Sequence, residues 1–446
     1  MRTLRRQDVY TKLHRIATLA KQAPDMVFTT LAHHMDVAWL EEAYRRTRKD
    51  GAPGIDGQTA AEYASHLEVN LRSLLDRAKS GRYQAPAVRR THIPKGDGVA
   101  TRPIGIPTFE DKILQRAVVM LLEPVYEQDF RDCSYGFRPG RSAHQALETL
   151  WRALESHGGG WVLEVDIRQF FDRLNHQVLR ELVQQRVRDG VVLRLLGKWL
   201  KAGVLEDGAL SYPETGTPQG GVISPLLANI YLHHVLDAWW SDEVGPRLRG
   251  PAQLVRYADD FVIVFASEHD ARRVAAVLPR RLARFGLEVH PDKTRLVAFR
   301  PPRRTEGPSG NDLKPGTFDF LGFTHYWGRS RRGRPTVCRK TAASRFRRAC
   351  KRAHDWLRVN RHQPVGWQHA QLTRKLQGHD AYYGITGNYI ALHRLRRFVE
   401  RRWCYWLNRR SRGKPMPWPR FQRLLACYPL PAARVVQSVF GPAAKP

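Results

Sequence analysis

Two adjacent carboxylates, Asp259 and Asp260, lie between apolar runs at residues 254–255 and 261–265. The five consecutive apolar residues predict a strand buried on both faces, and the whole segment predicts a β-hairpin with the acids at its tip. Carboxylates held together at the edge of a core repel each other, and a divalent cation with oxygen ligands, above all Mg²⁺, relieves that repulsion. Asp-Asp is also a common turn dipeptide, because Asp side chains bond to their own backbone. The pair alone leaves a metal site and an ordinary turn as alternatives.

A third carboxylate, Asp166, lies near the end of residues 161–168, where large apolar side chains occupy every second position. This alternation predicts a strand that carries Asp166 at the end of its other face. In one sheet, the two strands would bring Asp166, Asp259 and Asp260 to a single point. Their oxygens suffice for two metal ions about 3.5 to 4 Å apart, the spacing used for in-line phosphoryl displacement. Taken alone, Asp166 is equally compatible with a strand-end aspartate bonded to a turn.

The length and charge of the chain limit the class of protein. Its 446 residues allow two or three domains with a sizeable core. The formal net charge is +32, and +25 of it lies in residues 327–446, which contain 28 Lys and Arg but only three acids. A segment this basic predicts a polyanionic partner. A ribosomal-type RNA or an anionic membrane surface would satisfy the charge as well, but no segment approaches the roughly 20 apolar residues that span a bilayer.

The cysteines and the N-terminus indicate the compartment. No Cys-x-x-Cys pair occurs among the five widely spaced cysteines, which argues against a disulfide framework and a structural zinc site. Reduced cytosol is the natural environment for such a chain. The basic N-terminus has no apolar stretch after it, so no secretory signal is expected. These features predict a cytoplasmic protein.

Three motifs follow one another in order: Asp-Ile-Arg-Gln-Phe-Phe-Asp occupies 166–172, Thr-Pro-Gln-Gly-Gly begins 217–229, and Tyr-Ala-Asp-Asp occupies 257–260. In this order they resemble the motifs of bacterial group II intron reverse transcriptases. Further segments continue the resemblance in order: 51–57, similar to the N-terminal extension; 93–107, similar to the fingers; 134–142, similar to the family's inserted block; 286–294; 318–323; and 378–384, similar to the maturase thumb. The resemblance spans nearly the whole chain, and ordered motifs are more specific than any one of them.

The resemblance implies an α+β fold of the right-hand polymerase type, with fingers, an antiparallel palm sheet and a helical thumb. We expect an N-terminal extension at 1–75, reverse transcriptase fingers and palm at 76–326, and a basic, helical thumb/maturase domain at 327–446. The implied activity is RNA-directed DNA synthesis by two Mg²⁺ ions. Asp166 and Asp259 would bridge both ions, the Ile167 carbonyl would add an oxygen, and Asp260 would complete the acidic cluster.

Residues for the incoming dNTP follow from residue chemistry and from the resemblance. Lys95 and Arg102 are cations on a fingers hairpin that could clamp the triphosphate, although charged hairpin edges also prevent unwanted strand pairing. Gln219 lies in a Pro-Gln-Gly-Gly turn, where backbone approaches a ligand closely, although Pro-Gln-Gly alone is merely a turn. By resemblance, Phe171 packs under the sugar and excludes a 2′-hydroxyl, and Asp172 belongs to the same site.

The basic segment contains candidates for RNA contacts. Tyr382 and Tyr383 precede a helical pattern in which Arg394, Arg397 and Arg401 share one face. Arginine rows suit phosphates, and aromatic rings could stack on unpaired bases. The tryptophans at 403 and 406 are better explained as core residues. Lys293 could meet a backbone phosphate, and a plain surface lysine is the alternative.

We therefore expect an RNA-directed DNA polymerase that also binds group II intron RNA to assist splicing and retromobility. Its partners would be the structured intron RNA, an RNA template, a DNA primer and dNTPs. The paired cysteines of the family's endonuclease domain do not occur here, so the endonuclease-lacking type is expected. Two alternatives remain: a domesticated reverse transcriptase in phage defence, CRISPR adaptation or repair, and a non-catalytic RNA chaperone.

Overall fold

The computed structural model describes residues 2–94, 101–206, 209–212, 220–301, 316–330, 332–410 and 415–438. These residues form two compact units. Within the described ranges, the first unit comprises residues 2–146 and 162–296, and the second comprises 147–161 and the residues from 297 onward. The predicted boundary between residues 326 and 327 falls inside strand β10 (Phe323–Arg329), which is paired on both sides. The division by contacts therefore lies before that strand rather than within it.

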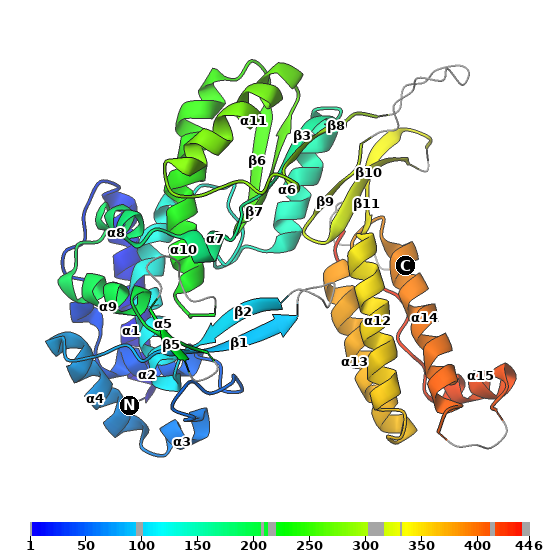
Figure 1. Ribbon diagram of the computed structural model, residues 1–446, viewed down its shortest axis with the longest axis horizontal. Helices are drawn as coiled ribbons and strands as arrows, with labels where there is room; N and C mark the ends of the chain where they lie inside the picture. The colour runs from blue at the N-terminus through cyan, green and yellow to red at the C-terminus, as the bar shows by residue number, and fades with distance from the viewer. Residues whose placement is uncertain are drawn as a thin grey trace. The chain divides into compact units, whose positions relative to one another are not determined.

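The N-terminal part of the first unit is helical. Helices α1 (Arg2–Gln22) and α2 (Val37–Arg46) pack on α5 (Phe109–Asp129), and α3 (Ala60–Ala64) and α4 (Leu67–Ser80) lie beside them. Helix α5 begins where the Thr108 side chain accepts a hydrogen bond from the Asp111 N–H. Most of its residues are buried, which makes α5 the centre of this part of the molecule (Figure 1).

A hairpin and three helices continue the first unit. Strands β1 (Val88–Pro94) and β2 (Thr101–Ile106) are antiparallel, and β4 (Val204–Glu206) and β5 (Ala209–Ser211) extend the sheet in the order β2-β1-β4-β5. The helices α7 (Phe170–Arg173), α8 (His176–Gln184) and α9 (Gly190–Leu200) follow the strand that carries Asp166.

The sheet that positions the predicted acids has the order β6-β7-β3-β8. Its strands are β3 (Gly160–Asp166), β6 (Ala252–Tyr257), β7 (Asp260–Phe265) and β8 (Arg295–Phe299). Residues 261–265 of β7 are all completely buried, as the apolar run predicts. Helix α11 (Glu268–Ala283) packs against β7, and α10 (Ser224–Leu232) continues into helical turns to Arg247 (Figure 1). The first residues of α6 (Ala143–Ser156) also belong to this unit.

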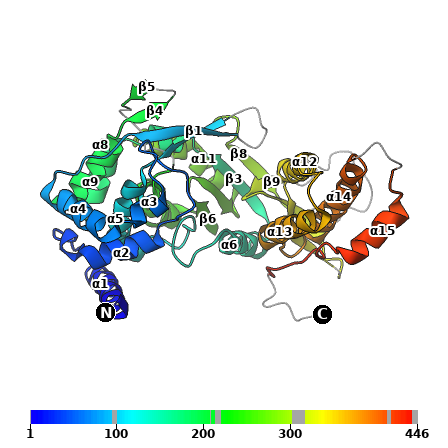
Figure 2. The ribbon, with the colours of Figure 1, turned by 90° about the horizontal axis from the view of Figure 1, so that it is seen from below.

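The second unit combines a small sheet with four helices. Strands β9 (Phe318–Phe320), β10 and β11 (Pro335–Thr341) form an antiparallel sheet in the order β11-β10-β9. Helices α12 (Ala343–Val359), α13 (Val365–Tyr383) and α14 (Tyr389–Leu407) lie side by side, and α15 (Trp418–Cys427) follows (Figures 1 and 2). Trp403 is completely buried and donates to Gln368 Oε1, and Trp406 packs against the same core.

The structure agrees with the predicted mixed class of helices and sheets, with an antiparallel hairpin in the sheet of the acids. Nowhere in the described ranges is a helix both long and apolar enough to cross a bilayer.

Candidate active site

The predicted hairpin is confirmed, and it carries the paired acids at its turn. Strands β6 and β7 are antiparallel, and Tyr257 pairs with Asp260 to close the hairpin around Ala258 and Asp259. Ala258 has φ of 58°, a left-handed conformation that L-residues other than glycine seldom adopt. Asp166 ends β3, which neighbours β7 in the sheet. The sequence-predicted strands therefore bring Asp166 to the same region as the hairpin turn.

The electrostatics of Asp259 indicate that two carboxylates lie close together here. Burial raises the pKa of Asp259, and the charge of Asp166 raises it further. Its own backbone N–H and the guanidinium groups of Arg102 and Arg256 act in the opposite direction but do not restore the ordinary pKa. Asp259 is therefore a half-buried carboxylate whose ionised form is destabilised, and a cation would relieve that destabilisation.

Lys293 supplies one cation. Its Nζ donates to Asp166 Oδ2 at 3.0 Å. Both side chains are substantially exposed, so this ion pair is screened by solvent. In the structure, Lys293 thus contacts the Asp166 carboxylate. The expected contact between Lys293 and a nucleic-acid phosphate stays a prediction.

The main chain around Asp166 is held by the segment that precedes Lys293. The Asp166 carbonyl accepts from the His290 N–H at 2.7 Å, and the Arg168 N–H donates to the Glu288 carbonyl at 2.8 Å. These bonds flank the bridge between Ile167 and Val289. That pairing leaves the Ile167 carbonyl, the predicted oxygen ligand, out of its hydrogen bonds.

A fully buried arginine holds the turn from inside. The Arg256 guanidinium pairs with Asp237, and neither side chain is exposed to solvent. It also donates to the Ala258 carbonyl and to Asn229 Oδ1, each at 3.0 Å. Although burial lowers the pKa of Arg256, the charge and the hydrogen bonds of Asp237, together with the weaker effects of Cys133 and Asp259, outweigh burial and raise the pKa above its usual value. Arg256 therefore fixes the carbonyl that directly precedes Asp259.

Sequence reasoning missed this network. The available signal is that Arg256 interrupts an apolar strand and that Asp237 follows an apolar helical stretch. Two opposite charges in buried segments indicate a pair, because an unpaired buried charge is too costly.

A second buried network reaches Ile223, in the described part of the motif at 217–229. The Asp111 carboxylate accepts from Tyr83 and from Trp199 Nε1, and Gln115 Nε2 donates to it at 3.0 Å. Gln115 Oε1 in turn accepts from the Ile223 N–H at 3.3 Å. Burial raises the pKa of Asp111 to about 6, although the three donors counteract the rise. No arginine or lysine takes part in these hydrogen bonds.

The predicted dNTP residues are described only in part. Lys95 and Gln219 lie outside the described residues. Arg102 lies on β2 opposite Ile93, is exposed, and lowers the pKa of Asp259 through its charge. Phe171 is half-buried in α7 with its ring centroid 5.2 Å from that of Phe170, and the neighbouring Asp172 is exposed. Arg102 is thus placed within electrostatic reach of the aspartate turn.

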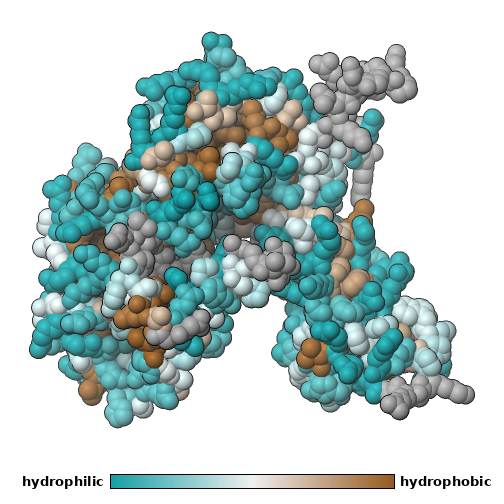
Figure 3. Space-filling view, in the orientation of Figure 1, coloured by the Kyte–Doolittle hydropathy of each residue, from teal (hydrophilic) through white to brown (hydrophobic). Residues whose placement is uncertain are grey.

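The predicted RNA-contact residues of the second unit divide into two groups. Arg394, Arg397 and Arg401 are all exposed on α14, whose opposite side is buried, as the helical spacing predicts. Figure 3 shows a largely hydrophilic surface over this unit. Tyr382 and Tyr383 instead pack against Phe323, with ring centroids 5.9 and 5.3 Å away. A role for these tyrosines in RNA binding stays a prediction.

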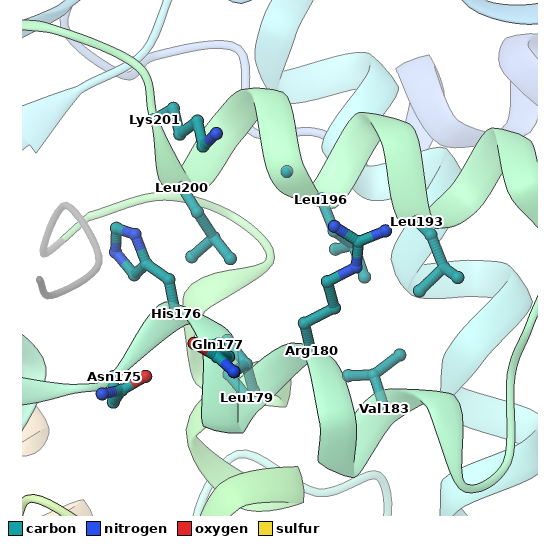
Figure 4. A pocket seen from close by; sticks show the side chains of 11 residues that line it. Asn175, His176, Gln177, Leu179, Arg180, Val183, Leu193, Leu196, Leu200 and Lys201 are labelled. Atoms are coloured by element: carbon teal, nitrogen blue, oxygen red, sulfur yellow. The ribbon is translucent and has the colours of Figure 1, made fainter. Parts of the chain in front are cut away.

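A pocket of about 630 Å³ lies between α8 and α9. Figure 4 shows its lining side chains, which include Leu179 and Leu196 together with His176, Arg180 and Lys201. None of the predicted site residues lines this pocket.

The residues present suit divalent cations by their chemistry. No group of three His, Cys, Asp or Glu side chains is assembled as a metal site in the part of the chain that the structure describes. Asp166 and Asp259 nevertheless interact as like charges, and the half-buried Asp259 has a raised pKa. Carboxylate oxygens are the ligands that Mg²⁺ prefers. The donor set therefore fits the predicted ions.

Carboxylates on adjacent strands, beside a basic hairpin and in a chain that also carries a basic helical unit, are typical of an enzyme that joins nucleotides. A profile of the family described as reverse transcriptase (RNA-dependent DNA polymerase) matches residues 93–325, and the chain belongs to this family. The predicted enzyme class is thereby confirmed at the level of the family.

Individual relatives confirm the resemblance to group II intron proteins. The chain is 39% identical over 227 residues to the group II intron-encoded protein LtrA of Lactococcus lactis subsp. cremoris, covering 50% of this chain and 37% of that protein. It is 40% identical over 257 residues to Protein YkfC of Escherichia coli K12, covering 51% and 67%. It is also 34% identical over 97 residues to the Arabidopsis thaliana nuclear intron maturase 1, mitochondrial, covering 21% and 13%. The chain spans well under two thirds of the length of LtrA and of the Arabidopsis maturase.

Proposed function

We propose that this chain is an RNA-directed DNA polymerase of right-hand architecture that extends a DNA primer with dNTPs on an RNA template. The observation that carries the proposal is the electrostatic effect of Asp166 on Asp259, at the ends of neighbouring strands of a reverse transcriptase-family chain. In this architecture the sheet β6-β7-β3-β8 is the palm, the β1–β2 hairpin belongs to the fingers, and the helices of the second unit form the thumb.

Each residue of the site then has a defined task. Asp166, Asp259 and the Ile167 carbonyl would hold two Mg²⁺ ions, with Asp260 completing the cluster. Bound there, the ions would help to remove the primer 3′-hydroxyl proton and neutralise charge at the α-phosphate. Arg102, together with Lys95, orients the triphosphate through charge-assisted hydrogen bonds.

The remaining dNTP residues would set the choice of nucleotide. Phe171 occupies the space of a 2′-hydroxyl and so favours dNTPs over ribonucleotides. Asp172 and Gln219 belong to the same binding site.

We further propose that the second unit binds structured intron RNA as a maturase. The relatives named for group II introns and intron maturation support this role. The exposed arginines of α14 and the +25 charge of residues 327–446 supply the electrostatic attraction. The RNA would provide the splicing chemistry, and the protein would stabilise its fold.

Replacing Asp259 with Asn tests the polymerase. The amide removes a ligand charge with little change in shape, so primer extension on an RNA template should fall by at least about 100-fold. The fold should persist. A raised pKa means that the folded protein is stabilised by the protonated form and loses that contribution as the carboxyl ionises, and the neutral amide restores it. The melting temperature should therefore stay equal or rise.

A matched control is Asp76→Asn, because Asp76 on α4 forms an exposed ion pair with Arg82, which follows the end of that helix. This variant should extend primers at the wild-type rate. Undiminished extension by Asp259→Asn would refute the assignment, and RNA binding without any extension by the wild type would favour the chaperone alternative.

A further inference from the structure

One large apolar side chain beside the aspartate turn is exposed. Residues 133–136 and Arg138 are buried, whereas the Phe137 side chain between them is 58% exposed. Its ring lies 6.3 Å from the Tyr257 ring, centroid to centroid, with an interplanar angle of 43°. Exposure of a single aromatic residue within a buried loop is not explained by packing of the core.

The backbone of Phe137 is also unfavourable. Its φ is 58°, in the left-handed region, where a bulky aromatic residue costs free energy that Asn or Gly would largely avoid. Strained residues of this kind persist where the surrounding structure fixes them, and they concentrate at functional sites. The position therefore holds a residue that suits neither the local conformation nor solvent.

The residues on both sides hold the loop in place. A Cβ on Gly136 would lie 2.3 Å from the Ala258 nitrogen, so the loop backbone packs directly on the aspartate turn. Asn229 Nδ2 donates to the Gly136 carbonyl at 2.7 Å. On the other side, Arg138 donates to Glu127 and to the Ser134 carbonyl. The Phe137 ring therefore projects from a loop that is packed and hydrogen-bonded against the turn carrying Asp259.

We propose that the Phe137 ring is a nucleic-acid contact that stacks on a base or sugar of the primer–template duplex beside Asp259; this inference rests on the proposed polymerase function. A primer whose 3′ end reaches Asp259 must pass the loop that packs on Ala258. Aromatic stacking tolerates any base, because every base has a π-face, and it suits an enzyme that copies any sequence. The occupant is therefore the duplex itself rather than a specific base edge.

The decisive variant is Phe137→Asn. If the ring is a nucleic-acid contact, the variant should keep or gain stability, whereas if the ring packs against the protein, the variant should lose stability. Asn tolerates the left-handed conformation, so the melting temperature should stay equal or rise. Loss of one stacking contact should weaken the Kd for a primer–template duplex by about 5- to 30-fold. Phe137→Tyr should retain wild-type affinity. Tyr10→Ala is the control, because Tyr10 is an exposed aromatic residue on α1, which packs on α2 and α5.

Duplex affinity would be measured by fluorescence anisotropy and extension by single-turnover kinetics at saturating duplex. Weakened affinity with an unchanged saturated rate and an undiminished melting temperature supports the contact. Wild-type affinity of Phe137→Asn overturns it, and so does a joint fall in affinity and melting temperature, which would identify a packing residue. A wild-type protein that binds the duplex without extending it would instead refute the polymerase function and leave the contact measurable.

Discussion

The buried arginines of the first unit are paired with acids, whereas three arginines on helix α14 of the second unit face solvent. Arg256 with Asp237, and Arg186 with Asp129, are buried pairs of the first unit. On α14, Arg394, Arg397 and Arg401 are exposed in a segment whose 28 Lys and Arg meet only three acids. A buried ion pair is stable only in one arrangement of its side chains, so it can hold the adjacent backbone in place. Exposed charges of one sign instead attract a polyanion over a longer range without a fixed geometry.

Removing the Arg256 cation should have the largest effect. In Arg256→Met, the Asp237 carboxylate is left buried without a partner, which costs about 3 to 5 kcal/mol of unfolding free energy. The Ala258 carbonyl also loses its donor. Urea unfolding should therefore show a large fall in the unfolding free energy, and primer extension should be much slower than in the wild type.

A milder pair of variants separates positioning from stability. Arg256→Lys keeps the charge but loses the bidentate fork, so the Mg²⁺ concentration for half-maximal extension should rise several-fold. Arg186→Lys is the matched control, because Arg186 forms a similar buried pair with Asp129 away from the turn. It should lower stability without changing the Mg²⁺ requirement. An equal Mg²⁺ shift in both variants would show that buried pairs of this unit act only through stability.

Asp111 is a buried acid without an arginine or lysine partner in the hydrogen bonds that the structure describes, because its donors are neutral side chains. It therefore shows what burial does to an acid that lacks a paired cation. Its pKa of about 6 exceeds the ordinary 3.8, so its stabilising contribution is full below pH 3.8 and is lost as pH rises through 6. The wild-type unfolding free energy should fall by up to about 3 kcal/mol over this window relative to Asp111→Asn. Urea unfolding of both proteins at pH 4.5 and 7 measures the difference.

Asp36 provides a control of opposite sign. Burial raises the pKa of Asp36, but the Lys12 ammonium and the Trp39 N–H outweigh burial and lower the pKa overall. The stability that Asp36 contributes is therefore present at neutral pH and lost on acidification. Parallel pH profiles for Asp111→Asn and Asp36→Asn would contradict both assignments.

The sequence predicts the hairpin and Asp166 because apolar alternation and the buried run at 261–265 are local signals. It does not predict the Arg256–Asp237 pair, because residues far apart in sequence meet only in the folded sheet and helix. The same limit applies to Tyr382, whose ring packs on Phe323, and to Lys293, whose ammonium contacts Asp166. Local periodicity places a side chain on a face, but its partner depends on the tertiary structure.

The smallest expected effect concerns the exposed arginines. Replacing Arg394, Arg397 and Arg401 with Gln should lower the slope of log Kd against log salt for a structured RNA by about 2, because each phosphate contact contributes about 0.7. Stability should change by less than about 0.5 kcal/mol, since the side chains are exposed. Filter binding at several salt concentrations measures the slope.

The control is a triple variant in the first unit, with Arg72, Arg82 and Arg272 replaced by Gln. These three arginines are exposed, and each forms an ion pair with a nearby acid. It removes the same formal charge from a surface whose field is already neutralised, so the salt slope should be unchanged. Equal slopes for the two triples would mean that RNA attraction follows total charge alone. Different slopes would mean that RNA is attracted mainly by the excess of basic over acidic residues on the second unit's helices. That result would locate the RNA on this surface.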